Sequence, residues 1–265
     1  MRPATGRIVF LILSLFLLFS FTGNIKGEGA AAEDGDSARA ESPSNKAGAI
    51  NTLIQNVMTA YGGKTAVENA KSVYASGTIR AFAFNDRGTY VRYFKRYRKL
   101  RVDIKYTRSS ELRILNGKRA YESIDGAPLS MVTGDRYQAM EYQYRQLDLP
   151  YGLLRNPDEI SYEGKAYLKG VAVEILSINN TEGPPMKVYI DAKTFQIIKV
   201  SGYFSVSRST MALSAEFADF KKVDGTIFPF TIINYADGQK IAETSIRDYR
   251  INPEIGDSLF SPSTN

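Results

Sequence analysis

The feature that most constrains the fold is a run of short apolar segments, separated by turn sequences, between residues 186 and 251. In its central part apolar residues take every second position: Met211, Leu213, Ala215 and Phe217. This period of two is typical of a β-strand with one solvated face. Tight turns are expected at three places: Asp191 to Thr194, Asp224-Gly225 and Asp237-Gly238. The pattern predicts a meander of antiparallel strands in a mainly β protein.

One predicted strand of this meander, from Phe228 to Tyr235, is apolar on both faces. Phe228, Phe230 and Ile232 share one face, whereas Ile233 and Tyr235 share the other. Such a strand must be covered on both sides, or it must line an apolar space that the protein does not fill. The sequence leaves these two alternatives open.

Residues 1–27 have the character of an export signal. Arg2 and Arg7 precede an apolar run from Ile8 to Phe21, which is the order of parts in a secretory signal peptide. The run is shorter than the ~20 residues that a membrane-spanning helix needs. We expect a cleaved signal and a periplasmic protein, with an uncleaved membrane anchor as the alternative.

Residues 28–47 contain no aromatic or branched aliphatic side chain. Such a segment cannot bury enough apolar area to offset the entropy of ordering it, so we expect a disordered linker. The remaining residues 48–261 are enough for one domain with its own core. A content of 43% hydrophobic residues, with 17 Tyr and 14 Phe, suits a β-rich globular domain.

The chain contains neither histidine nor cysteine. It therefore lacks the usual general base near neutral pH, the common zinc ligands, thiol nucleophiles and disulfides. No nucleophile elbow, P-loop or dinucleotide-binding sequence occurs. The formal net charge of +6 falls to +3 when the export signal is removed, which gives little support to a nucleic-acid partner. We expect no enzyme activity, no cofactor or metal, and no nucleic-acid binding.

Two stretches have helical periodicity instead. Apolar residues from Ile50 to Tyr61 recur at helical spacing, and Gly62-Gly63 follows as a helix stop. A second helix, within residues 135–150, carries an aromatic and aliphatic stripe: Tyr137, Met140, Tyr144 and Leu147. An isolated helix of this kind in a β chain needs an apolar surface to cover.

Residues 89–106 are predicted to form one long strand. Its second half has the cleanest alternation in the chain, with three apolar residues on one face: Leu100, Val102 and Ile104. If the alternation continues backwards, Arg96 and Arg98 project to this apolar side. A guanidinium there needs a partner such as a carbonyl or a phosphate, or else reaches solvent at the strand end. The sequence has 13 Lys or Arg residues between positions 80 and 119, Arg92 among them, and a solvated sheet face is expected to account for most of them.

The order of these parts resembles the LolA/LolB-like family of periplasmic lipoprotein carriers over roughly residues 48–261. Signal peptide, N-terminal helix, meander with a helical insertion and C-terminal strand pair follow in the same sequence. Four local sequences add to the resemblance: Lys95-Arg96, Leu112 to Tyr121, Val223 to Pro229 and Ile251 to Phe260. Tyr97 stands where the family has Pro after its Lys-Arg pair, and Asn116 stands where it has Asp.

The resemblance implies an unclosed, strongly curved antiparallel sheet, a half-barrel, with helices covering its concave face. In such carriers acyl chains lie between sheet and helices, and the Arg of the Lys-Arg pair ties the helical lid shut. That role falls on Arg96. The candidate residues of the cavity and lid are Arg96, Leu100, Val102, Ile104, Tyr137, Met140, Tyr144, Leu147, Phe228, Phe230 and Ile232.

The function that the resemblance implies is a monomeric periplasmic carrier. It would bind acyl chains of lipoproteins or another lipid for transfer towards the outer membrane, between an inner-membrane transporter and an outer-membrane acceptor. The alternative is an envelope-stress or assembly regulator that uses the same fold to bind a membrane-protein partner.

Overall fold

The structure is a computed structural model that describes residues 43–262, except residues 156, 180–182, 184 and 207–208. The predicted signal peptide and residues 28–42 of the predicted linker lie outside the described residues. Residues 43–47 of that linker belong to the first helix.

The described chain contains four α-helices, two short 3-10 helices and one sheet of 13 strands. The helices are α1 (Pro43–Ala60), α2 (Lys64–Asn69), α3 (Gly134–Leu147) and α4 (Gly152–Arg155), with 3-10 helices η2 (Pro157–Glu159) and η3 (Asp257–Phe260). The strands are β1 (Ser72–Ala81), β2 (Asp86–Lys95), β3 (Lys99–Tyr106), β4 (Ser110–Asn116), β5 (Arg119–Ile124), β6 (Ser130–Val132), β7 (Ile160–Leu168), β8 (Val171–Ile178), β9 (Met186–Asp191), β10 (Ile197–Val206), β11 (Ser209–Val223), β12 (Thr226–Ala236) and β13 (Gln239–Ile251).

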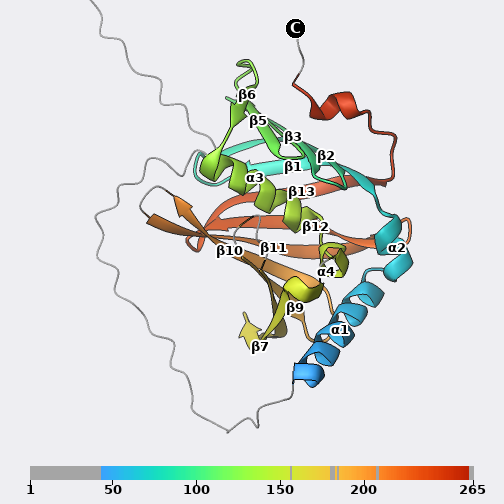
Figure 1. The fold of residues 1–265 in the computed structure, drawn as a ribbon. Coiled ribbons are helices and arrows are strands. Elements are labelled where there is room, and N and C mark those ends of the chain that lie inside the picture. Colours follow the sequence, from blue (N-terminus) through green and yellow to red (C-terminus); the bar gives the residue numbers. More distant parts are fainter. Residues whose placement is uncertain (1–42, 156, 180–182, 184, 207–208, 263–265) are drawn as a thin grey trace, which may run out of the picture.

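All 13 strands form one antiparallel sheet in the order β6-β5-β4-β3-β2-β1-β13-β12-β11-β10-β9-β8-β7. The first strand, β1, pairs with the last, β13, so that the two ends of the β region meet in the middle of the sheet. The edges are β6 and β7, and the sheet is not closed into a barrel. This confirms the predicted unclosed antiparallel half-barrel (Figure 1).

The path of α3 follows from this topology. Because β6 and β7 are opposite edges of one sheet, the segment that joins them must cross the whole sheet. Figure 1 shows α3 running across the strands, with α4 continuing towards the β7 side. The helix has Asp135 in its first turn and Arg145 in its last, which suits the helix dipole at both ends.

The meander predicted over residues 186–251 is confirmed as β9 to β13. The Asp191 carboxylate accepts hydrogen bonds from the backbone N–H groups of Lys193 and Thr194, at 2.7 and 2.9 Å. At both Asp-Gly turns the two residues have positive φ, between 43° and 89°, as tight hairpin turns require. The local turn chemistry therefore acts as the sequence predicted.

The prediction of a single strand over residues 89–106 is wrong. The chain turns back at Arg96-Tyr97-Arg98, and the hairpin pairs β2 with β3. Tyr97 and Arg98 have φ of 67° and 69°, a conformation that costs non-glycine residues roughly 1–2 kcal/mol each. No glycine or asparagine marks this turn, so sequence patterns missed it. The side chains of Arg96 and Arg98 in this turn both contact residues of α3 or its C-terminal end.

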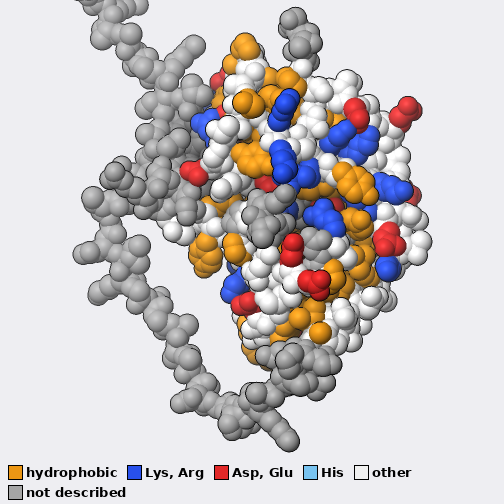
Figure 2. All heavy atoms as spheres, viewed as in Figure 1, with side chains coloured by type: hydrophobic (Ala, Val, Ile, Leu, Met, Phe, Trp, Pro, Cys, Tyr) orange, Lys and Arg blue, Asp and Glu red, His pale blue; other side chains and the backbone are white. Residues whose placement is uncertain are grey.

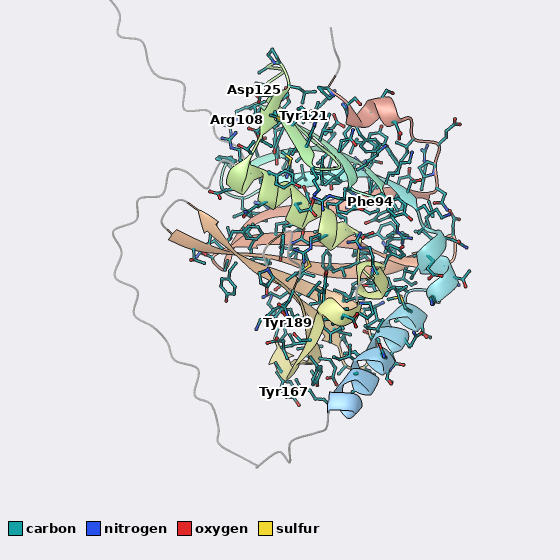
Figure 3. All side chains as sticks on the ribbon, viewed as in Figure 1. Phe94, Arg108, Tyr121, Asp125, Tyr167 and Tyr189 are labelled. Atoms are coloured by element: carbon teal, nitrogen blue, oxygen red, sulfur yellow. The ribbon has the colours of Figure 1, made fainter. Side chains whose placement is uncertain are left out.

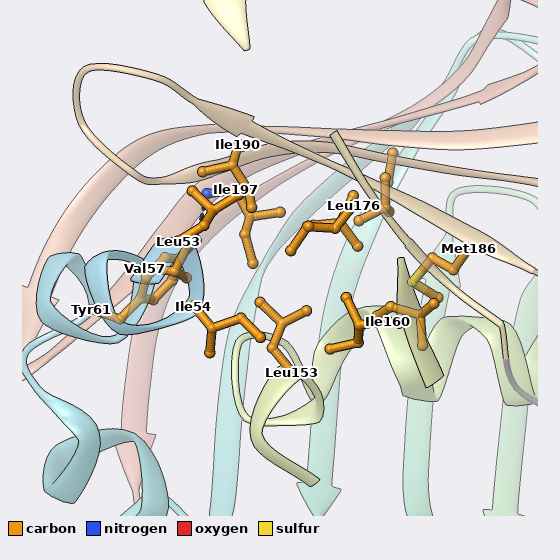
Figure 4. Packing of buried hydrophobic residues seen from close by; sticks show 14 of the residues in the cluster. Leu53, Ile54, Val57, Tyr61, Leu153, Ile160, Leu176, Met186, Ile190 and Ile197 are labelled. Atoms are coloured by element: carbon orange, nitrogen blue, oxygen red, sulfur yellow. Dashed lines mark hydrogen bonds between the residues drawn. The ribbon is translucent and has the colours of Figure 1, made fainter. Parts of the chain in front are cut away.

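Buried apolar side chains form two main clusters on the sheet. The first lies where α1 packs on β8 to β11 and includes Leu53, Val57 and Leu176 (Figure 4). The hydroxyl of Tyr61, the last residue of the α1 stripe, accepts a hydrogen bond from the backbone N–H of Ile197 at 3.2 Å. The predicted first helix and its apolar face are thus confirmed.

The second cluster lies on β1 to β4 and β13, and α3 contributes to both clusters. Tyr142 of α3 belongs to the first cluster, whereas Met140 and Tyr144 belong to the second. The helix therefore bridges the two halves of the core. Two charged residues of α3 outside its apolar stripe, Glu141 and Arg145, are also buried.

Candidate functional site

Two neighbouring cavities lie between α3 and the concave face of the sheet, with volumes of about 70 and 100 Å³. The first extends towards α2 and β12, and the second extends towards β11 and β13. Five residues line both: Arg92, Gln146, Leu147, Phe217 and Ile232. The cavities are therefore two parts of one hollow, with the C-terminal half of α3 over it.

The size of these cavities limits what they hold while α3 is in this position. Pockets that bury a drug-sized ligand have volumes of roughly 300–1,000 Å³. The hollow is smaller because Met140 and Tyr144 of α3 pack into the sheet beside it, each 1% exposed. A long hydrocarbon chain therefore requires α3 to move away from the sheet.

Arg96, in the turn between β2 and β3, connects three segments at one end of the hollow. Its guanidinium donates hydrogen bonds to the backbone carbonyls of Val67 and Glu68 in the last turn of α2. It lies 3.5 Å from the centroid of the Tyr151 ring, which is a cation–π contact. Its Nε is 3.6 Å from Oδ1 of Asp148, the residue that follows α3. Arg96 thus attaches α2 and the end of α3 to the hairpin.

Asp148 is a buried carboxylate between two arginines. Arg155 Nη1 lies 3.6 Å from Oδ2, as Arg96 Nε does from Oδ1. Neither oxygen has a hydrogen-bond partner among the described residues. Burial raises the pKa of Asp148 to about 6, and the charges of Arg155 and Arg96 oppose this rise. The attachment of α3 at this end therefore contains a group that titrates near neutral pH.

A second polar attachment holds the middle of α3. Arg98 Nη2 lies 2.9 Å from the carboxylate of Glu141 and donates a hydrogen bond of 2.7 Å to the hydroxyl of Tyr137. The Glu141 side chain is 3% exposed. The two arginines of one turn thus bind α3 at two points along its length.

The apolar stripe of α3 packs on the β2–β3 hairpin. The rings of Tyr144 and Phe94 are stacked, with centroids 5.1 Å apart, and Phe94 is labelled beside α3 in Figure 3. Tyr144 and Met140 share the second cluster with three predicted residues of β3: Leu100, Val102 and Ile104. Leu147, the last residue of the predicted stripe, lines both cavities.

The doubly apolar strand, β12, borders the hollow. Phe228 lines the first cavity and stacks on Tyr249, with centroids 4.8 Å apart. Ile232 lines both cavities, whereas Tyr235, on the opposite parity, lines the second. Phe230 packs edge-on against Tyr249 at 5.1 Å and does not line either cavity.

The predicted residues of the cavity and lid all lie on the concave side of the sheet, but only some of them line the cavities. Four line the cavities: Arg96, Leu147, Phe228 and Ile232. The others pack in or against the second cluster: Leu100, Val102, Ile104, Tyr137, Met140, Tyr144 and Phe230. The site residues that the sequence interpretation missed are Asp148, Phe217 and above all Arg92.

The prediction of a solvated sheet face for the basic residues between 80 and 119 is wrong for Arg92. This arginine is 4% exposed and lies on the concave face, between Ala75 of β1 and Val102 of β3 in the sheet register. A signal was present, because Arg92 has the parity of Tyr90 and Phe94, both of which are buried.

Other charged groups on this face are paired. Arg113 Nε lies 2.8 Å from Glu111, and its Nη1 donates a hydrogen bond of 3.2 Å to Gln143 of α3. Glu122 is paired with Arg136 of α3. Burial raises the pKa of Glu111, and Arg113 opposes this rise. The surface above the helix carries basic, acidic and hydrophobic side chains together (Figure 2).

Two features are absent from the described residues. No group of three or more Asp or Glu side chains there is placed to hold a metal ion. No helix in this part of the chain is long and apolar enough to cross a membrane. The arrangement beneath α3 offers burial, cation–π contacts and hydrogen-bond donors to a ligand.

Comparison with models of known protein families finds no match, and no curated protein matches the chain. The solved structures that resemble the fold include two bacterial proteins. A DUF1329 family protein from Desulfovibrio piger is 13% identical with a TM-score of 0.52, covering 80% of this chain and 97% of that one. A putative outer membrane lipoprotein-sorting protein domain from Vibrio parahaemolyticus is 11% identical, with the same TM-score and coverage. The chain therefore shares its fold with these two proteins, and this agrees with the fold that the resemblance of its motifs to lipoprotein carriers implied.

Proposed function

We propose that the protein is a periplasmic carrier that binds acyl chains between α3 and the concave face of the sheet. The observation that supports this most directly is the hollow beneath α3, where two cavities meet between the two hydrophobic clusters. Because the chain shares its fold with a putative outer membrane lipoprotein-sorting protein domain, we also propose that the bound lipid is transferred towards the outer membrane.

Burial of hydrocarbon supplies the binding energy in this proposal. Transfer of an acyl chain from water gains ~0.8 kcal/mol per CH₂, so a chain of ~16 carbons gains roughly 12 kcal/mol. Most of this gain must be available in the hollow, because a carrier competes with a membrane for the chain. The walls of the first cavity suit this role, since Val73, Phe94 and Phe228 are among its residues.

Loading and release both require α3 to open in this mechanism. The cavities present under α3 are too small for a whole acyl chain, and a chain bound with this energy would dissociate slowly on its own. The polar attachments through Arg96 and Arg98 are the contacts that opening must break. In this mechanism the bound acyl chain takes over apolar contacts that α3 makes with the sheet in the closed state.

The test is native mass spectrometry of the protein purified from the periplasm, followed by delipidation and titration with a fluorescent fatty acid. The proposal expects lipid adducts in the first experiment and saturable binding in the second. A protein that is consistently empty and does not bind the probe would refute it. Co-purification with an inner-membrane protein domain that survives lipid removal would support the regulatory alternative instead.

A further inference from the structure

Arg92 occupies a central position in the hollow. It projects from β2 on the concave face, and it lines both cavities. Gln146 and Leu147 of α3 line both cavities as well, so the guanidinium and the C-terminal half of α3 border the same space. A ligand in either cavity therefore has Arg92 in the cavity wall.

The guanidinium has unused hydrogen-bonding capacity. Its Nε and Nη1 have no hydrogen-bond partner among the described residues, although the side chain is 4% exposed. The phenol groups of Tyr90 and Tyr249 interact with the guanidinium through side-chain hydrogen bonds and electrostatics, and its Cζ lies 5.8 Å from the centre of the Tyr249 ring. Neither neighbour is a carboxylate.

Arg92 differs in this respect from the other arginines near α3. Arg96 is paired with Asp148, Arg98 with Glu141, and Arg113 with Glu111. Arg92 forms no ion pair within the described part of the chain. A buried cation without a counterion is costly, and oxyanions are the groups that the guanidinium geometry complements.

We propose that Arg92 binds the oxyanion of an anionic amphiphile, a carboxylate or phosphate joined to an acyl chain. The tail extends from Arg92 into the first cavity, along Val73, Phe94 and Phe228. The inference rests on the proposed acyl-chain carrier and narrows its ligand. Acyl chains held only through neutral ester or amide groups would not supply the charge that this site complements.

The test uses three probes that share the same fluorescent hydrocarbon chain. They are the free acid, its methyl ester and the corresponding alkyl phosphate. Dissociation constants are measured at pH 7.5, where the acid is ionised. A charge-assisted bidentate contact predicts that the acid or the phosphate binds roughly 10-fold or more tightly than the ester. Which of the two anions binds better identifies the source of the oxyanion.

Three variants locate the effect. Arg92→Met should bring the affinities for the three probes together, so that the preference for the anionic probes is lost. Arg92→Lys should keep part of the preference, because it keeps the charge but not the guanidinium geometry. Arg87→Met is the matched control, since Arg87 lies on the same strand with its side chain exposed. This variant should prefer the anionic probes over the ester as strongly as the unmodified protein does.

The outcomes separate this inference from the carrier proposal. Equal affinities for acid, phosphate and ester would overturn the proposed role of Arg92 and would mean that water hydrates its guanidinium. The carrier proposal would be unaffected by this result. A preference retained by Arg92→Met overturns it as well. Failure of all three probes to bind the unmodified protein refutes the carrier proposal and this inference together. If Arg92→Met does not fold, as judged by circular dichroism, Arg92→Lys and the probe comparison decide.

Discussion

Arg96 and Asp148 form a buried ion pair between the β2–β3 turn and the end of α3, with Arg96 Nε 3.6 Å from Asp148 Oδ1. The same guanidinium donates to two backbone carbonyls at the C-terminal end of α2, where the helix dipole favours a cation. A single side chain thus joins α2, the hairpin and α3. Opening of the hollow at this end must break or rearrange these contacts.

Arg96→Leu should lower the free energy of unfolding and speed the exchange of bound lipid. Removal of one partner from a buried ion pair typically costs ~3–5 kcal/mol, because the other charge is left uncompensated. Loading with a fluorescent fatty acid should persist, since Arg96 lies at one end of the hollow, but transfer to acceptor vesicles should become faster. Urea unfolding and a vesicle transfer assay measure the two effects.

The matched control for this variant is Arg108→Leu. Arg108 pairs with Asp86 at 3.5 Å, but its side chain is 72% exposed, so its loss should change stability little. Equal transfer rates for Arg96→Leu, Arg108→Leu and the unmodified protein would remove Arg96 from the opening mechanism.

Asp148 should make stability depend on pH between about 4 and 6. Its pKa in the folded protein is about 6, above the ordinary value of 3.8, so the folded state holds this proton more tightly than the unfolded state. The stability from this group is therefore complete below pH 4 and is lost as pH rises through 6. The difference between the two pKa values corresponds to ~3 kcal/mol.

Comparison with Asp148→Asn isolates this contribution, because both proteins share the other titrating groups, including Glu111. Unfolding free energies are measured by urea denaturation at several values from pH 4 to pH 7.5. The unmodified protein should lose stability relative to the variant as pH rises over this interval. Parallel curves would show that Asp148 does not titrate with the expected pKa.

Val73→Phe should weaken acyl-chain binding by filling the first cavity. Val73 is 6% exposed and lines that cavity, so the larger ring takes space that the chain would occupy. Overpacking costs typically ~1–3 kcal/mol, so the fold should survive. The affinity for a fluorescent fatty acid should fall roughly 10-fold or more. Thr78→Phe, on the exposed face of the same strand, should bind as the unmodified protein does.

Gly202→Ala should loosen α3 from the β10 side of the sheet. A Cβ at Gly202 would lie 2.7 Å from Cε2 of Tyr142 on α3 and 3.1 Å from the carbonyl oxygen of Pro185. The Tyr142 ring is buried and must shift, at a cost of ~1–3 kcal/mol in stability. Hydrogen exchange of α3 amides should accelerate relative to those of β1.

Gly48→Ala provides the control for this substitution. Nothing lies within 4 Å of a Cβ at Gly48, and the residue is in α1, so alanine should stabilise the helix by up to ~1 kcal/mol. Unchanged α3 exchange in Gly202→Ala would mean that the helix is not held by this close contact.

The sequence by itself determined the strands of the meander, the Asp-Gly turns and both amphipathic helices. Each of these depends on residues that are neighbours along the chain, such as the alternation from Met211 to Phe217 or the stripe from Tyr137 to Leu147. The order of the motifs then indicated the LolA-like fold. Arg96, predicted to face the cavity, lines the first cavity, although the long strand used in that prediction is wrong.

Only the tertiary structure decided how these elements are used. The pairing of β1 with β13 makes β6 and β7 the edges, and this carries α3 across the sheet and over the hollow. The turn at Tyr97 and Arg98 and the burial of Arg92 depend on residues far apart in the chain, such as Glu141 and Tyr249. Local periodicity does not report such contacts, because their energy arises only when distant segments meet.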